Sequence, residues 1–102
     1  MSDYRAMLLA RARALADLAC ERGEPELLRA VVWLELRASA HACTGLLERI
    51  AVQYLLLADH PEVRPQLGLA RRYAERAWRW ADAALHGAVP AAGPLARACD
   101  DA

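Results

Sequence analysis

Glycine and proline divide the chain into three long segments, and this division constrains the fold more than any other feature. Gly23 follows the first segment, Asp59-His60-Pro61 follows the second, and Gly87 follows the third. Glycine commonly stands just past the end of a helix, and proline cannot continue one. We therefore expect three helices, over residues 4–22, 26–58 and 66–86.

The middle segment has one weak point. No proline interrupts residues 26–58, but Thr44-Gly45 lies within them, and a helical glycine costs about 1 kcal/mol relative to alanine. The sequence predicts an all-α antiparallel bundle of three long helices, or of four if the middle helix breaks near Gly45. We expect residues 1–87 to form a single domain and residues 88–102 to form a flexible or short-helix tail.

Composition supports a helical fold. The 102 residues include 24 Ala and 17 Leu, whereas Val, Ile and Thr together number seven. Alanine and leucine favour helix, and the scarcity of β-branched residues disfavours sheet.

Charge and cysteine content narrow the classes of function. Thirteen Arg, with no Lys, balance thirteen acidic residues, so the net positive field of a general nucleic-acid coat protein is absent. The sequence has neither a secretory signal pattern nor an apolar run long enough to cross a bilayer. Three widely spaced Cys form no disulfide or zinc pattern, and Cys43 is expected in the core. We expect a cytoplasmic protein without a metal, a cofactor or a membrane contact.

The first two predicted helices each have a charge within an apolar face. Arg11 lies among Tyr4, Met7, Leu8, Leu15 and Leu18. Glu35 lies in the stripe of Leu28, Val32, Leu36, Cys43, Leu46, Ile50 and Leu57. Antiparallel helices joined near Gly23 would place Arg11 level with Glu35, and a buried charge needs a partner. The sequence therefore predicts a buried Arg11–Glu35 ion pair, which either fixes helix register or forms a polar centre for a small ligand.

The last predicted helix has an alanine-rich face and a charged face. The first consists of Leu67, Ala70, Ala74, Ala77, Ala81, Ala84 and Leu85, and the second of Arg71, Arg72, Glu75, Arg79, Asp82 and His86. Aromatic side chains at the margins either belong to the core or form an interface, because Trp and Tyr are enriched in binding hot spots. Val31 and Leu34, two apolar residues beside the stripe of the middle helix, widen that candidate interface. The candidate interface therefore consists of Tyr73, Trp78, Trp80, Val31 and Leu34.

Three short segments resemble the front half of small HEPN-type helical domains. They are Asp3-Tyr4-Arg5-Ala6-Met7-Leu8, Leu28-Arg29-Ala30-Val31 and Ala40-His41-Ala42-Cys43. The resemblance implies a helical bundle, often dimeric, and many members are toxins or ribonucleases that use an Arg and a His separated by four to six residues. Arg79 and His86 have that spacing, although Trp80 stands where the family usually has a polar residue.

The interpretation that follows is a non-enzymatic interaction module, acting as an accessory or regulatory subunit or an adaptor. Its partner would be another protein or, in a two-fold dimer, a second copy of the chain. The alternative is a HEPN-type ribonuclease toxin, or an inactive relative, in which Arg79 and His86 act on RNA. A third interpretation is a small-molecule sensor or enzyme built around Arg11 and Glu35.

Overall fold

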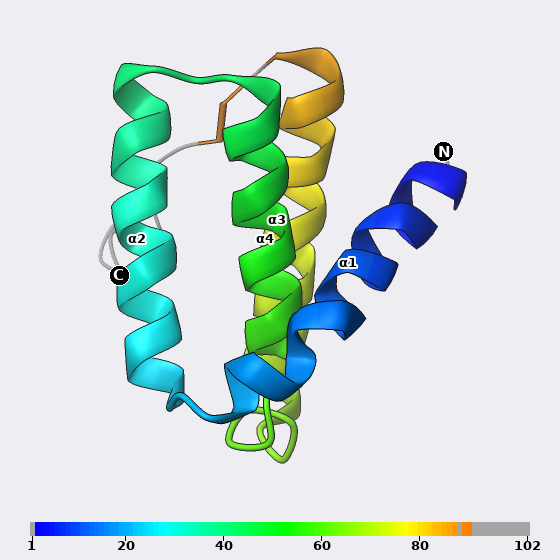
Figure 1. Ribbon diagram of the computed structural model, residues 1–102, viewed down its shortest axis with the longest axis vertical. Helices are drawn as coiled ribbons and strands as arrows, with labels where there is room; N and C mark the ends of the chain where they lie inside the picture. The colour runs from blue at the N-terminus through cyan, green and yellow to red at the C-terminus, as the bar shows by residue number, and fades with distance from the viewer. Residues whose placement is uncertain (1, 88, 91–102) are drawn as a thin grey trace.

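The computed structural model describes residues 2–87 and 89–90, and this part of the chain forms four α-helices with no strand. They are α1 (Ser2–Cys20), α2 (Glu24–Ala40), α3 (Thr44–Ala58) and α4 (Leu67–His86), arranged as a bundle (Figure 1). The all-α prediction is confirmed. The tail predicted at 88–102, apart from Val89 and Pro90, lies outside the described residues.

Pro25 and Gly87 stand at helix ends as expected, whereas α1 ends at Cys20 and Gly23 is the extended N-cap residue of α2. Pro25 lies in the first turn of α2, where its missing N–H is not needed. Gly87 caps α4 in the left-handed conformation, with φ of 82°, and its N–H donates to the carbonyl of Ala83 at 2.6 Å. The boundaries differ from the predicted ones by a few residues at most, apart from the break in the middle helix.

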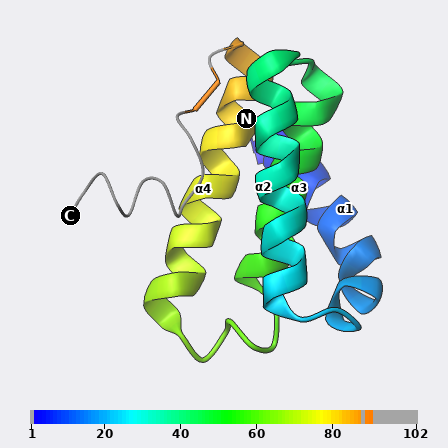
Figure 2. The same ribbon diagram turned by 90° about the vertical axis from the view of Figure 1, so that its left-hand side faces the viewer.

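The long middle helix breaks just before Thr44-Gly45. Residue His41 leaves helical geometry with φ of −143° and ψ of 82°, and Cys43 is extended with φ of −142° and ψ of 154°. The chain turns back here, so that α2 and α3 lie side by side (Figures 1 and 2). Gly45 lies in the first turn of α3 and not at the turn itself. The sequence indicates the weak point, and a turn next to it allows α3 to pack in the core.

Helix α3 is the centre of the fold. Each of the other three helices packs against it, and α4 does so most extensively. Its buried residues cover nearly the whole circumference: Leu47, Ile50, Ala51, Val52, Tyr54, Leu55, Leu56 and Leu57. Helices α1 and α2 lie on opposite sides of α3 (Figure 1). The expectation that the first helix faces the second across a hairpin is therefore wrong.

The core-facing side of α1 also differs from the prediction. Leu8, Ala12 and Ala19 are buried, whereas Leu15 and Leu18 are 42% and 63% exposed. Helix α1 lies obliquely across α3 (Figure 1), and alanine side chains allow the two backbones to approach closely. Met7, which is 38% exposed, Leu15 and Leu18 were predicted to face the core and instead face outward.

Candidate functional site

A buried polar cluster joins three helices at the centre of the bundle. The hydroxyl of Tyr54 on α3 donates to Glu35 Oε2 on α2 at 2.8 Å. Arg76 on α4 donates from Nη2 to the same oxygen at 3.3 Å. Glu35 and Arg76 are each 5% exposed at the side chain, and Tyr54 is fully buried. This cluster connects α2 to α3 and α4 through one carboxylate.

The predicted Arg11–Glu35 pair is wrong. Glu35 pairs with Arg76, and Arg11 is 45% exposed and pairs with Glu48 Oε1 of α3 at 3.3 Å. The physical reason is topological, because α3 lies between α1 and α2. Arg76 was missed, although it lies three residues after Tyr73 and four before Trp80, on the same side of a helix as these two aromatic residues.

Burial dominates the electrostatics of this cluster. Desolvation raises the pKa of Glu35, and the Tyr54 hydrogen bond and the Arg76 charge partly oppose that rise. Burial, together with the Glu35 carboxylate, also raises the pKa of Tyr54. Glu35 Oε1 is buried without a hydrogen-bond partner among residues 2–87 and 89–90. A polar cluster packed this tightly holds the helices in one arrangement.

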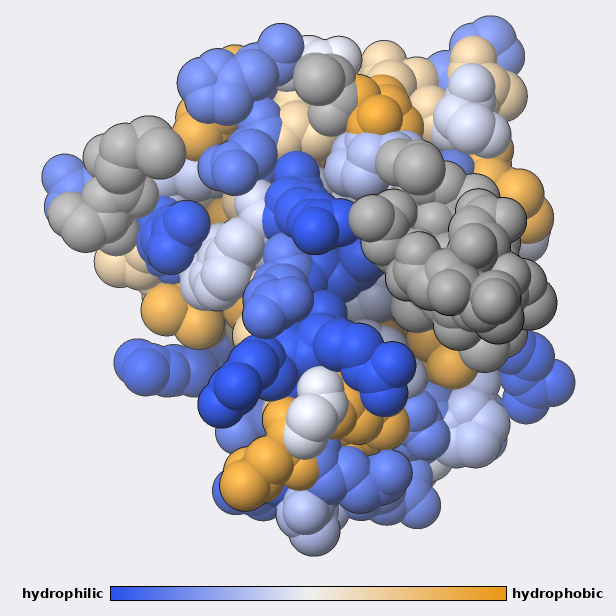
Figure 3. All heavy atoms as spheres, turned by 180° about the vertical axis from the view of Figure 1, so that it is seen from behind, coloured by the Kyte–Doolittle hydropathy of each residue, from blue (hydrophilic) through white to orange (hydrophobic). Residues whose placement is uncertain are grey.

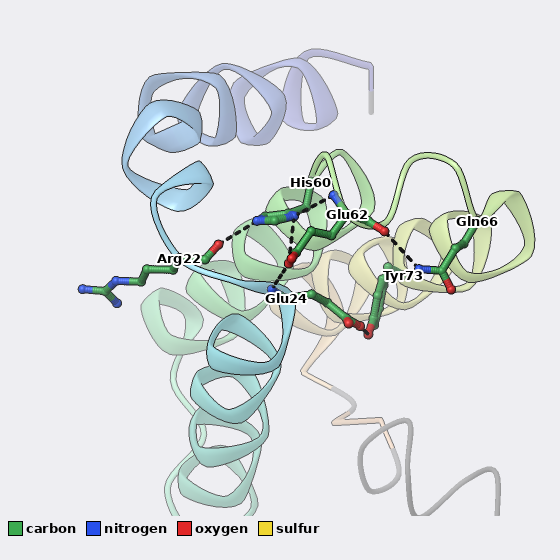
Figure 4. Close-up of polar contacts among 6 residues, drawn as sticks. All are labelled: Arg22, Glu24, His60, Glu62, Gln66 and Tyr73. Carbon is green, nitrogen blue, oxygen red and sulfur yellow. Dashed lines mark hydrogen bonds and ion pairs between the residues drawn. The ribbon is translucent and has the colours of Figure 1, made fainter.

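A second polar network connects the two loops at one end of the bundle (Figure 4). His60, in the loop between α3 and α4, is 4% exposed, and its Nε2 lies 2.7 Å from the carbonyl oxygen of Arg22. The N–H of Glu62 donates to His60 Nδ1 at 3.1 Å. Because Nδ1 accepts, Nε2 must donate to the carbonyl, and the imidazole is neutral in this arrangement. His60 therefore acts as a structural link between loops.

The same network caps α2. Glu62 Oε1 accepts from the backbone N–H of Glu24 at 2.7 Å, which places a carboxylate at the positive end of that helix. The hydroxyl of Tyr73 on α4 donates to Glu24 Oε2 at 2.7 Å. Gly23, the N-cap residue, offers no side chain for this role. Residues far apart in sequence thus fix where α2 begins.

Most of the predicted interface belongs to the core. Trp78 is half-buried, and the guanidinium of Arg5 lies 4.7 Å from its ring centroid. The other four members are between 0% and 4% exposed: Tyr73, Trp80, Val31 and Leu34. The interface assignment is wrong for these four, because α4 and α2 turn them toward α3. Cys43, predicted as a core residue, is exposed in the turn before α3.

Arg79 and His86 are exposed on the outer side of α4. They belong to the predicted charged face, whose six members are all exposed, and Figure 3 shows a hydrophilic band on this side of the molecule. Seven positions apart, they are separated by about 10 Å along the helix axis.

Large apolar side chains on the surface gather on α1 and α2. We define the α1 stripe as Met7, Leu15 and Leu18, which are 38%, 42% and 63% exposed and share one face of the helix. On α2, Trp33 and Leu36 are 55% and 65% exposed. The α1 stripe is the longer feature, and Arg11 lies within it. Met7, Leu15, Leu18 and Leu36 belong to the apolar faces that were predicted to face the core.

Residues 2–87 and 89–90 contain no cluster of three or more His, Cys, Asp or Glu side chains suited to a metal ion. No helix in the same part of the chain combines the length and hydropathy needed to span a bilayer.

Comparison with known proteins gives no relative. No protein-family model matches the chain, and no curated protein or solved structure matches it.

Proposed function

We propose that the chain is a protein–protein interaction module that pairs with a second copy of itself through the α1 stripe. The supporting observation is the exposure of Met7, Leu15 and Leu18 on a helix that packs chiefly against α3. Large apolar side chains exposed along one face of a helix are typical of interaction sites.

The order of residues along α1 favours a second copy as the partner. Met7, Arg11, Leu15 and Leu18 follow one another at intervals of four, four and three residues. In an antiparallel pair of α1 helices around a two-fold axis that crosses the stripe midway between Met7 and Leu18, Met7 of one copy lies beside Leu18 of the other. Arg11 then lies beside Leu15 of the other copy. A two-fold interface requires such self-complementarity.

Arg11 does not oppose this pairing. Its guanidinium already contacts Glu48 of the same chain, whose side chain is 19% exposed. Tyr4 donates a second hydrogen bond to Glu48, at 2.8 Å to Oε2. An apolar partner can therefore cover the aliphatic part of Arg11 while its charge stays paired.

Light scattering tests the proposal with a pair of matched variants. Leu18→Glu places a charge in the stripe, and Leu67→Glu places one at a 76% exposed position on α4. Neither change disturbs the core. We expect the wild type and Leu67→Glu to have about twice the 11.2 kDa mass of the chain, and Leu18→Glu to have the monomer mass. A monomeric wild type, or a dimeric Leu18→Glu variant, contradicts the proposal.

RNA cleavage of the HEPN type is the second candidate function. The observation that favours it is that Arg79 and His86 are exposed on the same side of α4. A dimer would have to bring both pairs to one phosphate, with His as acid or base and Arg stabilising charge. We expect any cleavage of single-stranded RNA to disappear in His86→Ala and persist in His41→Ala, where an exposed histidine outside α4 is changed.

A further inference from the structure

A groove of about 750 Å³ lies between α1, α3 and α4. Alanines form much of its surface, with contributions from all three helices. The lining alanines are Ala12, Ala16, Ala19, Ala58, Ala70 and Ala74, and Leu9, Leu55 and Leu56 also contribute. His60 and Arg64, from the loop between α3 and α4, line it as well. The groove is therefore a mainly apolar, small-residue surface.

This surface suits a helix better than a small ligand. Small side chains allow a packing helix to approach to about 8–10 Å between axes. The groove is flanked by exposed side chains, among them Arg13, Cys20 and Arg71. A small molecule bound there would stay partly in water, whereas binding pockets typically enclose roughly 70–90% of their ligand. An amphipathic helix would bury its apolar face and keep its polar face in solvent.

The charges around the groove identify the chemistry of that helix. Three arginines line it, Arg13, Arg64 and Arg71, against one acidic residue, Asp59. Arg64 Nε lies 4.0 Å from Asp59 Oδ1, and both side chains are mostly exposed. Arg13 and Arg71 form no ion pair within the described part of the chain. Two unpaired guanidinium groups beside an apolar surface favour carboxylates on the partner.

A second copy of the chain does not supply such a helix. On the exposed faces of α1, α2 and α4, arginines outnumber acidic side chains. Helix α3 is buried. The partner is therefore a different protein with a more acidic helix.

We propose that the groove between α1, α3 and α4 is the docking site for an amphipathic helix of another protein, with small apolar residues on one face and Glu or Asp along its flanks. This site goes beyond the self-association proposed above. None of Met7, Leu15 and Leu18 lines the groove, so both surfaces of α1 can be occupied at once.

Two synthetic peptides test the proposal by fluorescence anisotropy. Both are helical, about 18 residues long, with the same Ala and Leu face; one has Glu along its flanks and the other has Lys. We expect the Glu peptide to bind at least about tenfold more tightly than the Lys peptide, with an affinity that falls as salt rises. Equal binding of both peptides, or no binding of the Glu peptide, overturns the proposal.

Matched variants locate the binding. Arg13→Ala with Arg71→Ala removes the unpaired charges of the groove, and Arg29→Ala with Arg49→Ala removes two exposed arginines outside it. We expect the first pair to weaken Glu-peptide binding about tenfold or more and the second to leave it within about twofold. Equal losses in the two pairs would mean non-specific charge attraction and would contradict the site.

Two further outcomes would show that the groove has a different occupant from the one proposed. If Arg13→Ala with Arg71→Ala changed the oligomeric mass, the groove would be an interface between copies of the chain. If dodecanoate displaced the Glu peptide, the groove would be a site for an anionic amphiphile. We expect neither, and Leu18→Glu should leave peptide binding unchanged even where it abolishes the dimer, which separates this test from that of the α1 stripe.

Discussion

Arg76 and Glu35 form a buried ion pair between α4 and α2, with Nη2 3.3 Å from Oε2 and each side chain 5% exposed. Tyr54 donates to the same carboxylate oxygen from α3. Three helices thus meet at one acidic side chain. Loss of the Glu35 carboxylate removes a hydrogen-bond acceptor from both Tyr54 and Arg76.

Glu35→Ala should lower the free energy of unfolding by about 3–5 kcal/mol, because it breaks the buried ion pair with Arg76 and the buried hydrogen bond from Tyr54. Arg11→Ala, which removes the 45% exposed partner of Glu48, should cost less than about 1 kcal/mol. Urea denaturation followed by circular dichroism measures both. Similar losses for the two variants would show that Glu35 is less enclosed than described.

All three tyrosines of the chain donate to a glutamate: Tyr4 to Glu48, Tyr54 to Glu35 and Tyr73 to Glu24. Burial and the Glu48 hydrogen bond raise the pKa of Tyr4 to about 12, and burial with the neighbouring carboxylate raises the pKa of Tyr54 and of Tyr73. The contribution of each group to stability is complete below its unfolded pKa of about 10 and is lost as pH rises above it.

Ultraviolet absorbance titration checks this expectation. In the folded protein, no tyrosine should ionise near pH 10, whereas the urea-unfolded chain should titrate there with all three. Tyr4→Phe should make stability less sensitive to pH above about 10. A tyrosine that titrates near 10 in the folded chain would contradict the hydrogen bonding described.

The helix ends were predictable because they depend on local chemistry. Gly87 follows the end of α4 as predicted, where it adopts the left-handed conformation, and Pro25 occupies the first turn of α2. The turn before Thr44 was predicted only as an alternative. Whether the chain turns there depends on whether packing α3 in the core lowers the free energy more than continuing α2 as one long helix would. That difference is a property of the whole fold.

The partners of Arg11 and Glu35 were not predictable by the same means. A helical wheel gives the angle of a residue around its helix but not which helix lies opposite. Leu18 and Ala19 illustrate the difficulty, since the smaller residue is buried and the larger is exposed. Hydrophobicity favoured Leu18, but close packing of α1 on α3 favours alanine. The candidate surfaces could not be predicted without this packing of α1 on α3.

His60→Ala should destabilise the fold by about 2–4 kcal/mol, because the Arg22 carbonyl and the Glu62 N–H lose a buried partner and a cavity remains. His86→Ala, at an exposed position, should change stability by less than about 0.5 kcal/mol. Thermal unfolding compares the two. Equal midpoints would contradict the structural role of His60.

Replacement of Gly45 and of Gly87 by alanine should change the stability of the fold in opposite directions. A Cβ at Gly45 meets no atom within 4 Å, so Gly45→Ala should stabilise the protein by about 0.4–1 kcal/mol. Gly87 has φ of 82°, and Gly87→Ala should cost about 1–2 kcal/mol. Chemical denaturation measures both changes. A destabilising Gly45→Ala would mean that the start of α3 is crowded.

Disulfide cross-linking tests the antiparallel pairing of α1 most directly. In a chain whose three cysteines are replaced by serine, Met7→Cys with Leu18→Cys places two thiols at positions that would meet across the two-fold axis. We expect rapid oxidation to a covalent dimer, and no cross-link when cysteines replace Leu67 and Leu85 on α4. Failure of the Met7 and Leu18 pair to cross-link, in a protein that remains folded, would contradict self-association through the α1 stripe.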